Sequence, residues 1–195
     1  GGWRSQDVIS MLKTGMAGIT PDECDSVEEY LSTWRINGAR RWTAEYDWRM
    51  NPDGYTDTLT PRGERILATV NAIRAKIVPP LAALAESFTL DILSKTKGLT
   101  TDTACKADGL GNVKRASAAV YKLLCDFDIP GQLSEHEEEL ARQLWDALMN
   151  ALDTVATVAG DATVTAEQYS QLLAAVLRQA TVGRIPASVD EVTVG

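Results

Sequence analysis

Apolar residues at helical spacing run through nearly the whole chain, and this pattern limits the fold more than any other feature. Between residues 138 and 160, Leu140, Leu144, Leu148 and Leu152 recur every fourth position. A stripe of this kind covers one face of a helix and has to be buried against another element. Similar stripes occur over residues 6–13, 21–36, 61–93, 113–128 and 165–182. The sequence therefore predicts an all-α fold, an irregular multi-helix bundle.

Capping signals mark where these helices begin. Thr20 and Thr60 are each followed by proline, so a threonine cap precedes a residue whose missing N–H has no partner in a helix anyway. Residues 134–137 and 165–168 have the pattern of capping boxes. The Pro79-Pro80 pair removes two backbone donors, and we expect it to break or sharply kink the helix that begins at Pro61.

Two segments do not follow the helical pattern. Residues 98–112 are rich in Gly, Thr and Asp and are expected to form a surface loop. Residues 184–195 follow Gly183 with a proline and a β-type run of valines, which predicts a short extended C-terminal stub. A lone strand leaves its backbone groups unpaired. We therefore expect residues 1–195 to be a single helical domain from a longer protein that supplies the missing sheet.

Composition and charge narrow the classes of function. The net charge of −8 repels double-helical DNA overall, although it allows a local basic patch. No run of about 18 apolar residues and no signal peptide is visible, so we expect no membrane span. Three cysteines at unrelated spacings indicate a reducing, cytoplasmic setting without a disulfide framework or a cysteine metal site.

None of the catalytic motifs found in the sequence has the residue spacing or arrangement that its chemistry requires. The glycines near residue 110 lack the spacing of a phosphate-binding loop and follow no predicted strand. The SxxK and KTG strings of penicillin-recognising enzymes overlap here within residues 10–15, whereas in those enzymes they come from distant elements. The acidic runs at 22–29 and 135–139, with the single histidine His136, fit exposed helix N-termini better than metal ligands. We expect no catalytic residue and no metal site, and a stand-alone enzyme is disfavoured.

Arginine alternates with tryptophan over residues 34–49, and two interpretations are open. Such a segment can grip phosphates and stack on bases. Alternatively, the indoles anchor the core while the arginines cap a helix or pair with the acidic surplus, and the local pattern alone favours this second interpretation. The candidate DNA-binding residues are Arg35, Arg40, Arg41, Trp42 and Arg49.

Three stretches carry a resemblance to a known family. They are residues 5–16 (SQDVISMLKTGM), residues 29–42 (EYLSTWRINGARRW) and residues 183–195 (GRIPASVDEVTVG). They resemble the AddB family. AddB is the B subunit of AddAB-type helicase–nucleases and is called RexB in some bacteria. The likeness is clear at both ends of the chain. The region matched looks like the helical insertion called 2B in related helicases.

The resemblance implies a role in the repair of DNA. With an AddA-type helicase–nuclease subunit, this ATP-dependent helicase and deoxyribonuclease resects double-strand breaks for recombination and responds to Chi sequences. ATP, Mg²⁺ and an iron–sulfur cluster belong to other parts of such a protein, and no cofactor is expected within this chain. The first hypothesis is a non-catalytic helical domain that positions double-stranded DNA or braces the partner protein. The alternative is an acidic helical scaffold without DNA contact.

Overall fold

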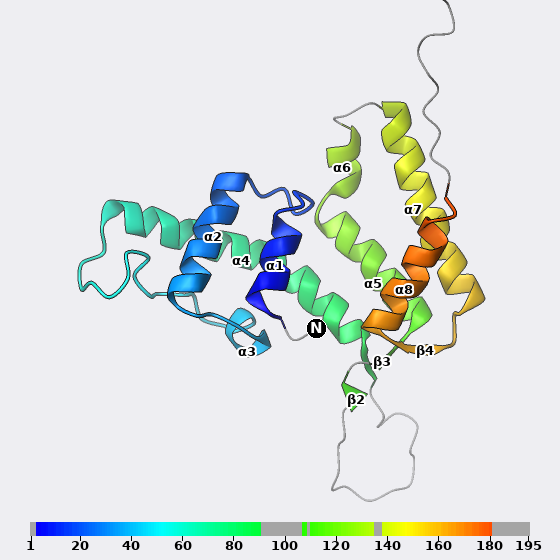
Figure 1. The fold of residues 1–195 in the computed structure, drawn as a ribbon, viewed down its shortest axis with the longest axis horizontal. Coiled ribbons are helices and arrows are strands. Elements are labelled where there is room, and N and C mark those ends of the chain that lie inside the picture. The colour runs from blue at the N-terminus through cyan, green and yellow to red at the C-terminus, as the bar shows by residue number, and fades with distance from the viewer. Residues whose placement is uncertain (1–2, 91–106, 109, 135–137, 181–195) are drawn as a thin grey trace, which may run out of the picture.

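The computed structural model describes residues 3–90, 107–108, 110–134 and 138–180. These residues are mostly helical, as the sequence predicts (Figure 1). The helices are α1 (Ser5–Leu12), α2 (Pro21–Thr33), α3 (Ala39–Trp42), α4 (Pro61–Ser87), α5 (Val113–Asp126), α6 (Ile129–Ser134), α7 (Glu138–Val158) and α8 (Ala166–Leu177). The strands are β1 (Thr89–Leu90), β2 (Ala107–Asp108), β3 (Leu110–Asn112) and β4 (Thr163–Thr165).

The long helix α4 connects two lobes. Figure 1 shows α1, α2 and α3 gathered along its N-terminal part, while α5, α6, α7 and α8 lie beyond its C-terminal part. We call these groups the N-terminal lobe and the C-terminal lobe. Because α4 packs against α2 in one lobe and against α5 in the other, both of its ends are held by tertiary contacts.

The Pro79-Pro80 pair does not break the helix, so that part of the prediction is wrong. Helix α4 runs through both prolines from Pro61 to Ser87. Ile77 and Pro80 are buried on the stretch where α4 meets α5. Burial of Ile77 and of the Pro80 ring offsets the cost of about 3 kcal/mol that an interior proline imposes on a helix.

The N-terminal lobe has the larger core. Helix α1 buries Val8, Ile9 and Leu12, and α2 buries Val27 and Leu31. The same core continues through α4 to residues of the other lobe. These contributions from α5, α6 and α7 are Leu124, Ile129 and Leu152, together with Phe127 just after α5.

Local signals set most helix starts where the sequence predicts them. Thr20 accepts a hydrogen bond from the N–H of Glu23 and completes a capping box, and Thr60 accepts one from Gly63. Helix α1 begins at Ser5, whose hydroxyl donates to the carbonyl of Ile36. That long-range bond fastens α1 to the loop after α2.

The C-terminal lobe encloses a second, smaller core. Phe88, Val113, Val155, Val164 and Tyr169 meet there from five different segments. The Phe88 and Tyr169 rings make an edge contact with centroids 5.8 Å apart. The Tyr169 hydroxyl donates to Ser117 Oγ at 2.9 Å, so the polar end of this buried ring is satisfied.

Two small antiparallel sheets accompany the helices. Strand β1 pairs with β2, and β3 pairs with β4 through Leu110–Thr165, Gly111–Val164 and Asn112–Thr163. The loop predicted over residues 98–112 therefore ends in strands, while residues 98–106 and 109 lie outside the described residues. Local sequence could not indicate this pairing, because the partner of β3 is some 50 residues away.

The short helix α6 follows α5 directly and covers Ile129–Ser134. The capping box at residues 134–137 and the stub at 184–195 fall outside the described residues, apart from Ser134. The capping box at Thr165 is present, with Gln168 as its second member.

By length and composition alone, α4 could cross a membrane, and among the described residues it is the one helix that meets this criterion. A core helix of a folded domain meets the same criterion. Because α4 contains Arg74 and Lys76 and packs against both α2 and α5, we interpret it as a core helix.

Candidate nucleic-acid interface

The four arginines proposed from the sequence all lie on the surface of the N-terminal lobe. Arg35 lies just after α2, and Arg40 and Arg41 lie on α3. Arg49 lies in the connection between α3 and α4. All four side chains are exposed. We call these four residues the arginine face.

Trp42 has a different environment. It is 0% exposed and lies among other rings of the large core. Its centroid is 5.2 Å from that of Trp48 and 6.5 Å from that of Trp3. A ring enclosed in this way has no open face for a base, so the core-anchor interpretation holds for Trp42. Trp48, also buried, stacks on Tyr30 at 5.8 Å, and burial raises the pKa of Tyr30.

The backbone between α2 and α3 is fixed by unusual torsions and by contacts with the N-terminus. Arg35 has a φ of 46° and Gly38 a φ of 83°, so the chain turns sharply twice. The Gly38 N–H donates to the Trp3 carbonyl at 3.0 Å, and the Ser5 N–H donates to Asn37 Oδ1 at 3.0 Å. These bonds hold the start of α3 against the start of α1.

A buried arginine holds the loop that follows α3. Arg74, on α4, is only 7% exposed and donates from three nitrogens to three backbone carbonyls. Nε reaches the Trp42 carbonyl at 2.8 Å, Nη1 reaches the Tyr46 carbonyl at 2.7 Å, and Nη2 donates to the Ala44 carbonyl. The guanidinium also lies 5.0 Å from the Trp48 ring centroid. We call this arrangement the Arg74 clamp.

The clamp satisfies a buried charge without a carboxylate. A guanidinium buried without hydrogen bonds would be very costly, and here the dipoles of three carbonyls and an aromatic face take the place of solvent. Because these carbonyls belong to residues 42–46, the clamp fixes the segment between Arg41 and Arg49. Asn71 adds two bonds to Trp48 from the same helix, one to its N–H and one to its carbonyl, both at 2.9 Å.

The electrostatics distinguish the arginine face from other surface arginines. Arg4 pairs with Asp7, and Arg142 pairs with Glu139. In contrast, no carboxylate among the described residues forms an ion pair with any arginine of the arginine face. Four exposed guanidiniums within 15 residues can therefore donate to phosphate oxygens without first breaking an ion pair.

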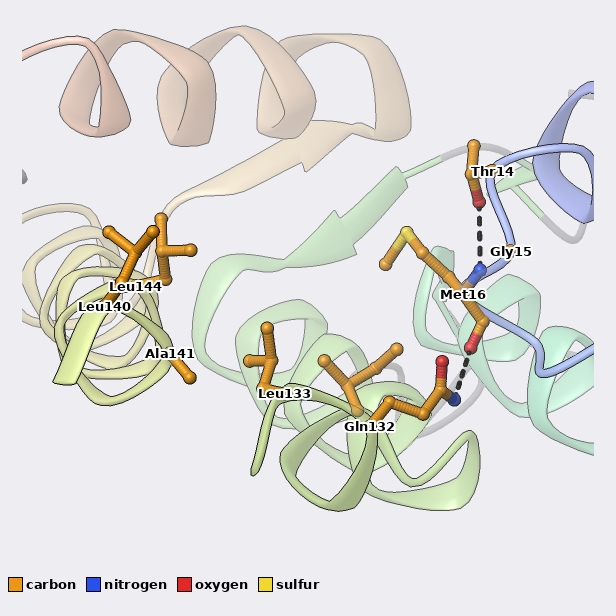
Figure 2. Close-up of a pocket in the computed structure, with 9 residues that line it drawn as sticks. Thr14, Gly15, Met16, Gln132, Leu133, Leu140, Ala141 and Leu144 are labelled. Atoms are coloured by element: carbon orange, nitrogen blue, oxygen red, sulfur yellow. Dashed lines mark hydrogen bonds between the residues drawn. The ribbon is translucent and has the colours of Figure 1, made fainter. Parts of the chain in front are cut away.

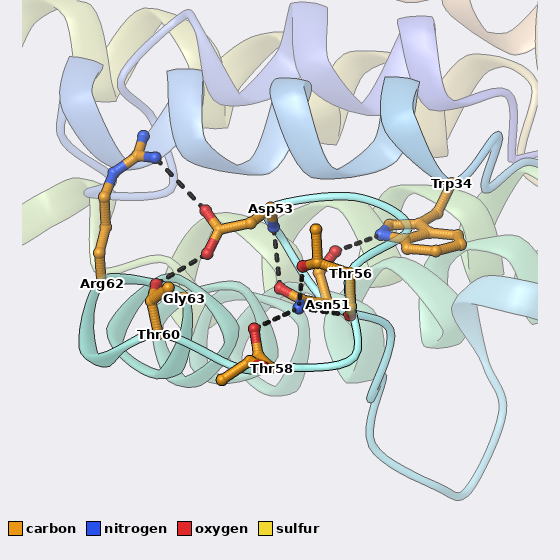
Figure 3. Close-up of polar contacts among 8 residues, drawn as sticks. All are labelled: Trp34, Asn51, Asp53, Thr56, Thr58, Thr60, Arg62 and Gly63. Carbon is orange, nitrogen blue, oxygen red and sulfur yellow. Dashed lines mark hydrogen bonds and ion pairs between the residues drawn. The ribbon is translucent and has the colours of Figure 1, made fainter.

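Residues 51–60 form a loop that is braced by its own side chains (Figure 3). Asn51 Nδ2 donates to the Thr56 carbonyl, to Thr56 Oγ1 and to the Thr58 carbonyl, all within 3.0 Å. Asn51 Oδ1 accepts from the Asp53 N–H at 3.0 Å, and Asp53 Oδ2 accepts from the Thr60 hydroxyl at 2.7 Å. Two side chains thus hold a loop that would otherwise depend on solvent.

A hollow of about 400 Å³ lies in another part of the molecule, between the 14–16 loop, α6 and α7 (Figure 2). Its walls include Met16, Leu133, Leu140 and Leu144. Gln132 spans one side by donating to the Met16 carbonyl at 3.1 Å. Among the described residues, no charged side chain lines this hollow, so that lining offers no general acid or base.

The other motifs do not converge on a reactive centre. Ser10 donates to the Gln6 carbonyl and Lys13 pairs with Glu28, so the SxxK string forms ordinary surface contacts. His136 lies outside the described residues. Within the described part of the chain, no group of three or more His, Cys, Asp or Glu side chains is placed to hold a metal ion.

The sequence interpretation missed the Arg74 clamp and the brace at Asn51. A signal for the clamp was present, because Val70, Ile73, Arg74 and Ile77 share one helical face and the other three are apolar. An arginine on such a stripe has to find partners inside the fold. The brace has a weaker signal, an asparagine before a proline in a turn-forming segment.

Comparison with known proteins gives consistent relatives, all of them B subunits of ATP-dependent helicase/deoxyribonucleases. The chain is 29% identical over 99% of its length to the B subunit of Acetivibrio thermocellus. The corresponding proteins of Natranaerobius thermophilus and Clostridium acetobutylicum are 28% and 26% identical, again over 99% of this chain. No family model matches the sequence.

The chain spans only a small part of these relatives, 16% of the Acetivibrio and Clostridium proteins and 18% of the Natranaerobius protein. Within that part the similarity is nearly end to end, as the resemblance seen in the sequence predicts. Over nearly its whole length the chain is thus similar to about one sixth of the AddB proteins, the B subunits of ATP-dependent helicase/deoxyribonucleases.

Proposed function

We propose that this chain is a non-catalytic helical domain of an AddB-type ATP-dependent helicase/deoxyribonuclease protein, corresponding to the 2B-type insertion of related helicases. In this role residues 1–195 form one domain of a longer cytoplasmic protein that resects double-strand breaks together with an AddA-type subunit. ATP, Mg²⁺ and an iron–sulfur cluster would be held by other parts of that protein. The similarity to AddB proteins across 99% of the chain supports this assignment.

We further propose that the arginine face holds double-stranded DNA by its phosphates. The observation that supports this most is the absence, among the described residues, of any carboxylate paired with Arg35, Arg40, Arg41 or Arg49. A net charge of −8 opposes DNA binding at long range. Since salt screens charges beyond about 8 to 10 Å, four local cations still attract a phosphate that comes close.

The test is the salt dependence of duplex binding by the purified chain. We expect R40A/R41A to lower the slope of log affinity against log salt concentration by about 2, because each lost phosphate contact releases about one counterion fewer. The probe is a fluorescein-labelled 20-base-pair duplex, followed by anisotropy between about 50 and 200 mM NaCl.

The matched control is R115A/R142A. It removes the same charge from exposed arginines of the C-terminal lobe. We expect its slope to equal that of the unchanged chain. Equal slopes for the unchanged chain and both double variants would reject the arginine face as a phosphate site.

A second candidate function is an acidic scaffold that docks a basic partner. The exposed carboxylates Asp22, Asp25 and Glu29 on α2 favour it. Salt-sensitive binding to the isolated AddA-type subunit, with no binding to the duplex probe, would select this function over the first.

A further inference from the structure

One aromatic ring of the N-terminal lobe is almost fully exposed. Tyr55, in the braced loop, is 92% exposed, whereas Trp42 and Trp48 of the same lobe are buried. The Tyr55 ring makes an edge contact with the half-buried ring of Trp34, with centroids 5.0 Å apart and planes inclined by 61°. A large ring left in water gains nothing from burial in the free protein, so its position calls for another explanation.

The protein holds this ring in place. Tyr55 lies between Asp53 and Thr56, both of which are tied to the Asn51 side chain. The indole N–H of Trp34 donates to the Asn51 carbonyl at 3.0 Å, so the ring under Tyr55 is anchored to the same brace (Figure 3). Arg62 lies 3.5 Å from the Asp53 carboxylate and supports the loop from α4. An exposed ring on a braced support loses little conformational entropy when it binds a ligand.

Two cations of the arginine face lie close in sequence to this ring pair and its brace. Trp34 directly precedes Arg35, and Arg49 is two residues before Asn51, whose carbonyl binds Trp34. Neither arginine has an ion-pair partner among the described residues. Aromatic rings beside cations match the chemistry of single-stranded nucleic acid, in which a base offers a π face and the backbone offers phosphates.

We propose that Tyr55, supported by Trp34, is a stacking platform for an unpaired DNA base, with Arg35 and Arg49 holding the neighbouring phosphates. This inference rests on the proposed function, since it assigns a second class of DNA substrate to the arginine face. Stacking tolerates any base, because every base has a π face. The platform therefore selects single-stranded or frayed DNA without selecting a sequence.

The experiment compares two labelled 12-nucleotide single strands that carry the same phosphates. One is oligo-dT and the other is an abasic strand, which lacks the bases. Y55A is expected to weaken binding of oligo-dT by about 5- to 100-fold, the range measured for loss of one base–aromatic stack. Binding of the abasic strand should not change, and Y55F should bind both strands like the unchanged chain.

Y121A is the matched control, because Tyr121 is an exposed tyrosine on α5 in the other lobe. We expect it to bind both strands normally. Circular dichroism should show that Y55A and Y121A retain their helices, since neither ring belongs to a buried core.

The possible failures can be told apart. If Y55A binds oligo-dT normally, or weakens both strands equally, the stacking platform is wrong, and the proposed function stands as long as R40A/R41A still weakens duplex binding. If the unchanged chain binds neither strand nor the duplex, both proposals fail. If Y55A leaves DNA binding intact but weakens binding to the AddA-type subunit, Tyr55 is a protein contact and the inference is overturned.

Discussion

The two lobes that share α4 hold their backbones in different ways. In the N-terminal lobe, long connections are fixed by polar side chains, as in the Arg74 clamp and the Asn51 brace. In the C-terminal lobe, the connection between α7 and α8 is short and bonds backbone to backbone with the start of α5. There the N–H groups of Val113 and Lys114 donate to the carbonyls of Ala162 and Gly160.

This difference indicates that the N-terminal lobe contains a feature, the buried cation of the Arg74 clamp, that packing alone does not require. A lobe closed by small residues and short strands needs no buried cation. The N-terminal lobe buries one cation at Arg74, while Arg41 and Arg49 remain exposed at the two ends of the segment that it holds. We infer that the clamp serves the arginine face as well as the fold.

The largest effect is expected from breaking the clamp. R74M removes the donors to one buried and two part-buried carbonyls, and we expect it to lower the free energy of unfolding by about 4 kcal/mol, since a carbonyl left unpaired costs about 1–3 kcal/mol. Urea unfolding followed by tryptophan fluorescence measures this change, because Trp42 and Trp48 lie beside the guanidinium.

The control for this substitution is R65M. Arg65 is exposed on the same helix, and a surface substitution of this kind should change stability by less than about 0.5 kcal/mol. If R74M is no less stable than R65M, the clamp does not hold the N-terminal lobe.

A smaller effect is expected from the tightest backbone contact of the C-terminal lobe. A Cβ added at Gly111 would lie 2.4 Å from the Ser87 carbonyl oxygen and 2.9 Å from Phe88 Cα. We expect G111A to destabilise the chain by about 2 kcal/mol, as overpacking in a core does. Thermal unfolding measures the loss.

The same variant sharpens the contrast between the lobes. At a temperature where G111A is folded, we expect the salt slope of duplex binding to match that of the unchanged chain, because the arginine face lies in the other lobe. A G111A slope as low as that of R40A/R41A would show that the lobes are not independent in DNA binding.

The smallest loss of stability is expected from breaking either of the two capping boxes, at Thr20 and at Thr165. The Thr20 box has a carboxylate as its second member, and the N–H and hydroxyl of Thr20 hold the pKa of Glu23 below its ordinary value. The Thr165 box has the neutral Gln168 in that position. T20A and T165A should each cost about 1 kcal/mol near neutral pH.

The pH dependence should separate the two boxes. A lowered pKa in the folded state stabilises the fold above the ordinary pKa of Glu23, and this contribution is lost as the pH falls through the lowered value. The cost of T20A should therefore shrink between about pH 5 and pH 3, while the cost of T165A stays constant. Urea unfolding at a series of pH values measures both, and a parallel decline would contradict the assignment.

The elements that the sequence predicts correctly are those with local causes. Thr20, Thr60 and Thr165 mark helix starts because a cap depends on residues three positions away. The exposure of the four arginines also follows from their charge. The continuation of α4 through Pro79 and Pro80 was missed because contacts with α5 override a local signal.

The remaining features depend on residues far apart in the sequence. The carbonyls that bind Arg74 lie 28 to 32 positions before it, and β4 lies some 50 residues after β3. The burial of Trp42 has the same origin, since its ring contacts Trp3 and Trp48 from other segments. An aromatic residue beside two arginines is compatible with a core anchor, which the local pattern favours, and also with a DNA contact until the fold is known.

The most direct measurement is an arginine footprint of the DNA complex. The purified chain would be modified with phenylglyoxal, with and without a 20-base-pair duplex, and each arginine quantified by mass spectrometry. We predict that DNA protects Arg35, Arg40, Arg41 and Arg49 while Arg115 and Arg142 react equally in both samples. Protection of the C-terminal arginines instead, or of none on the arginine face, would contradict the account.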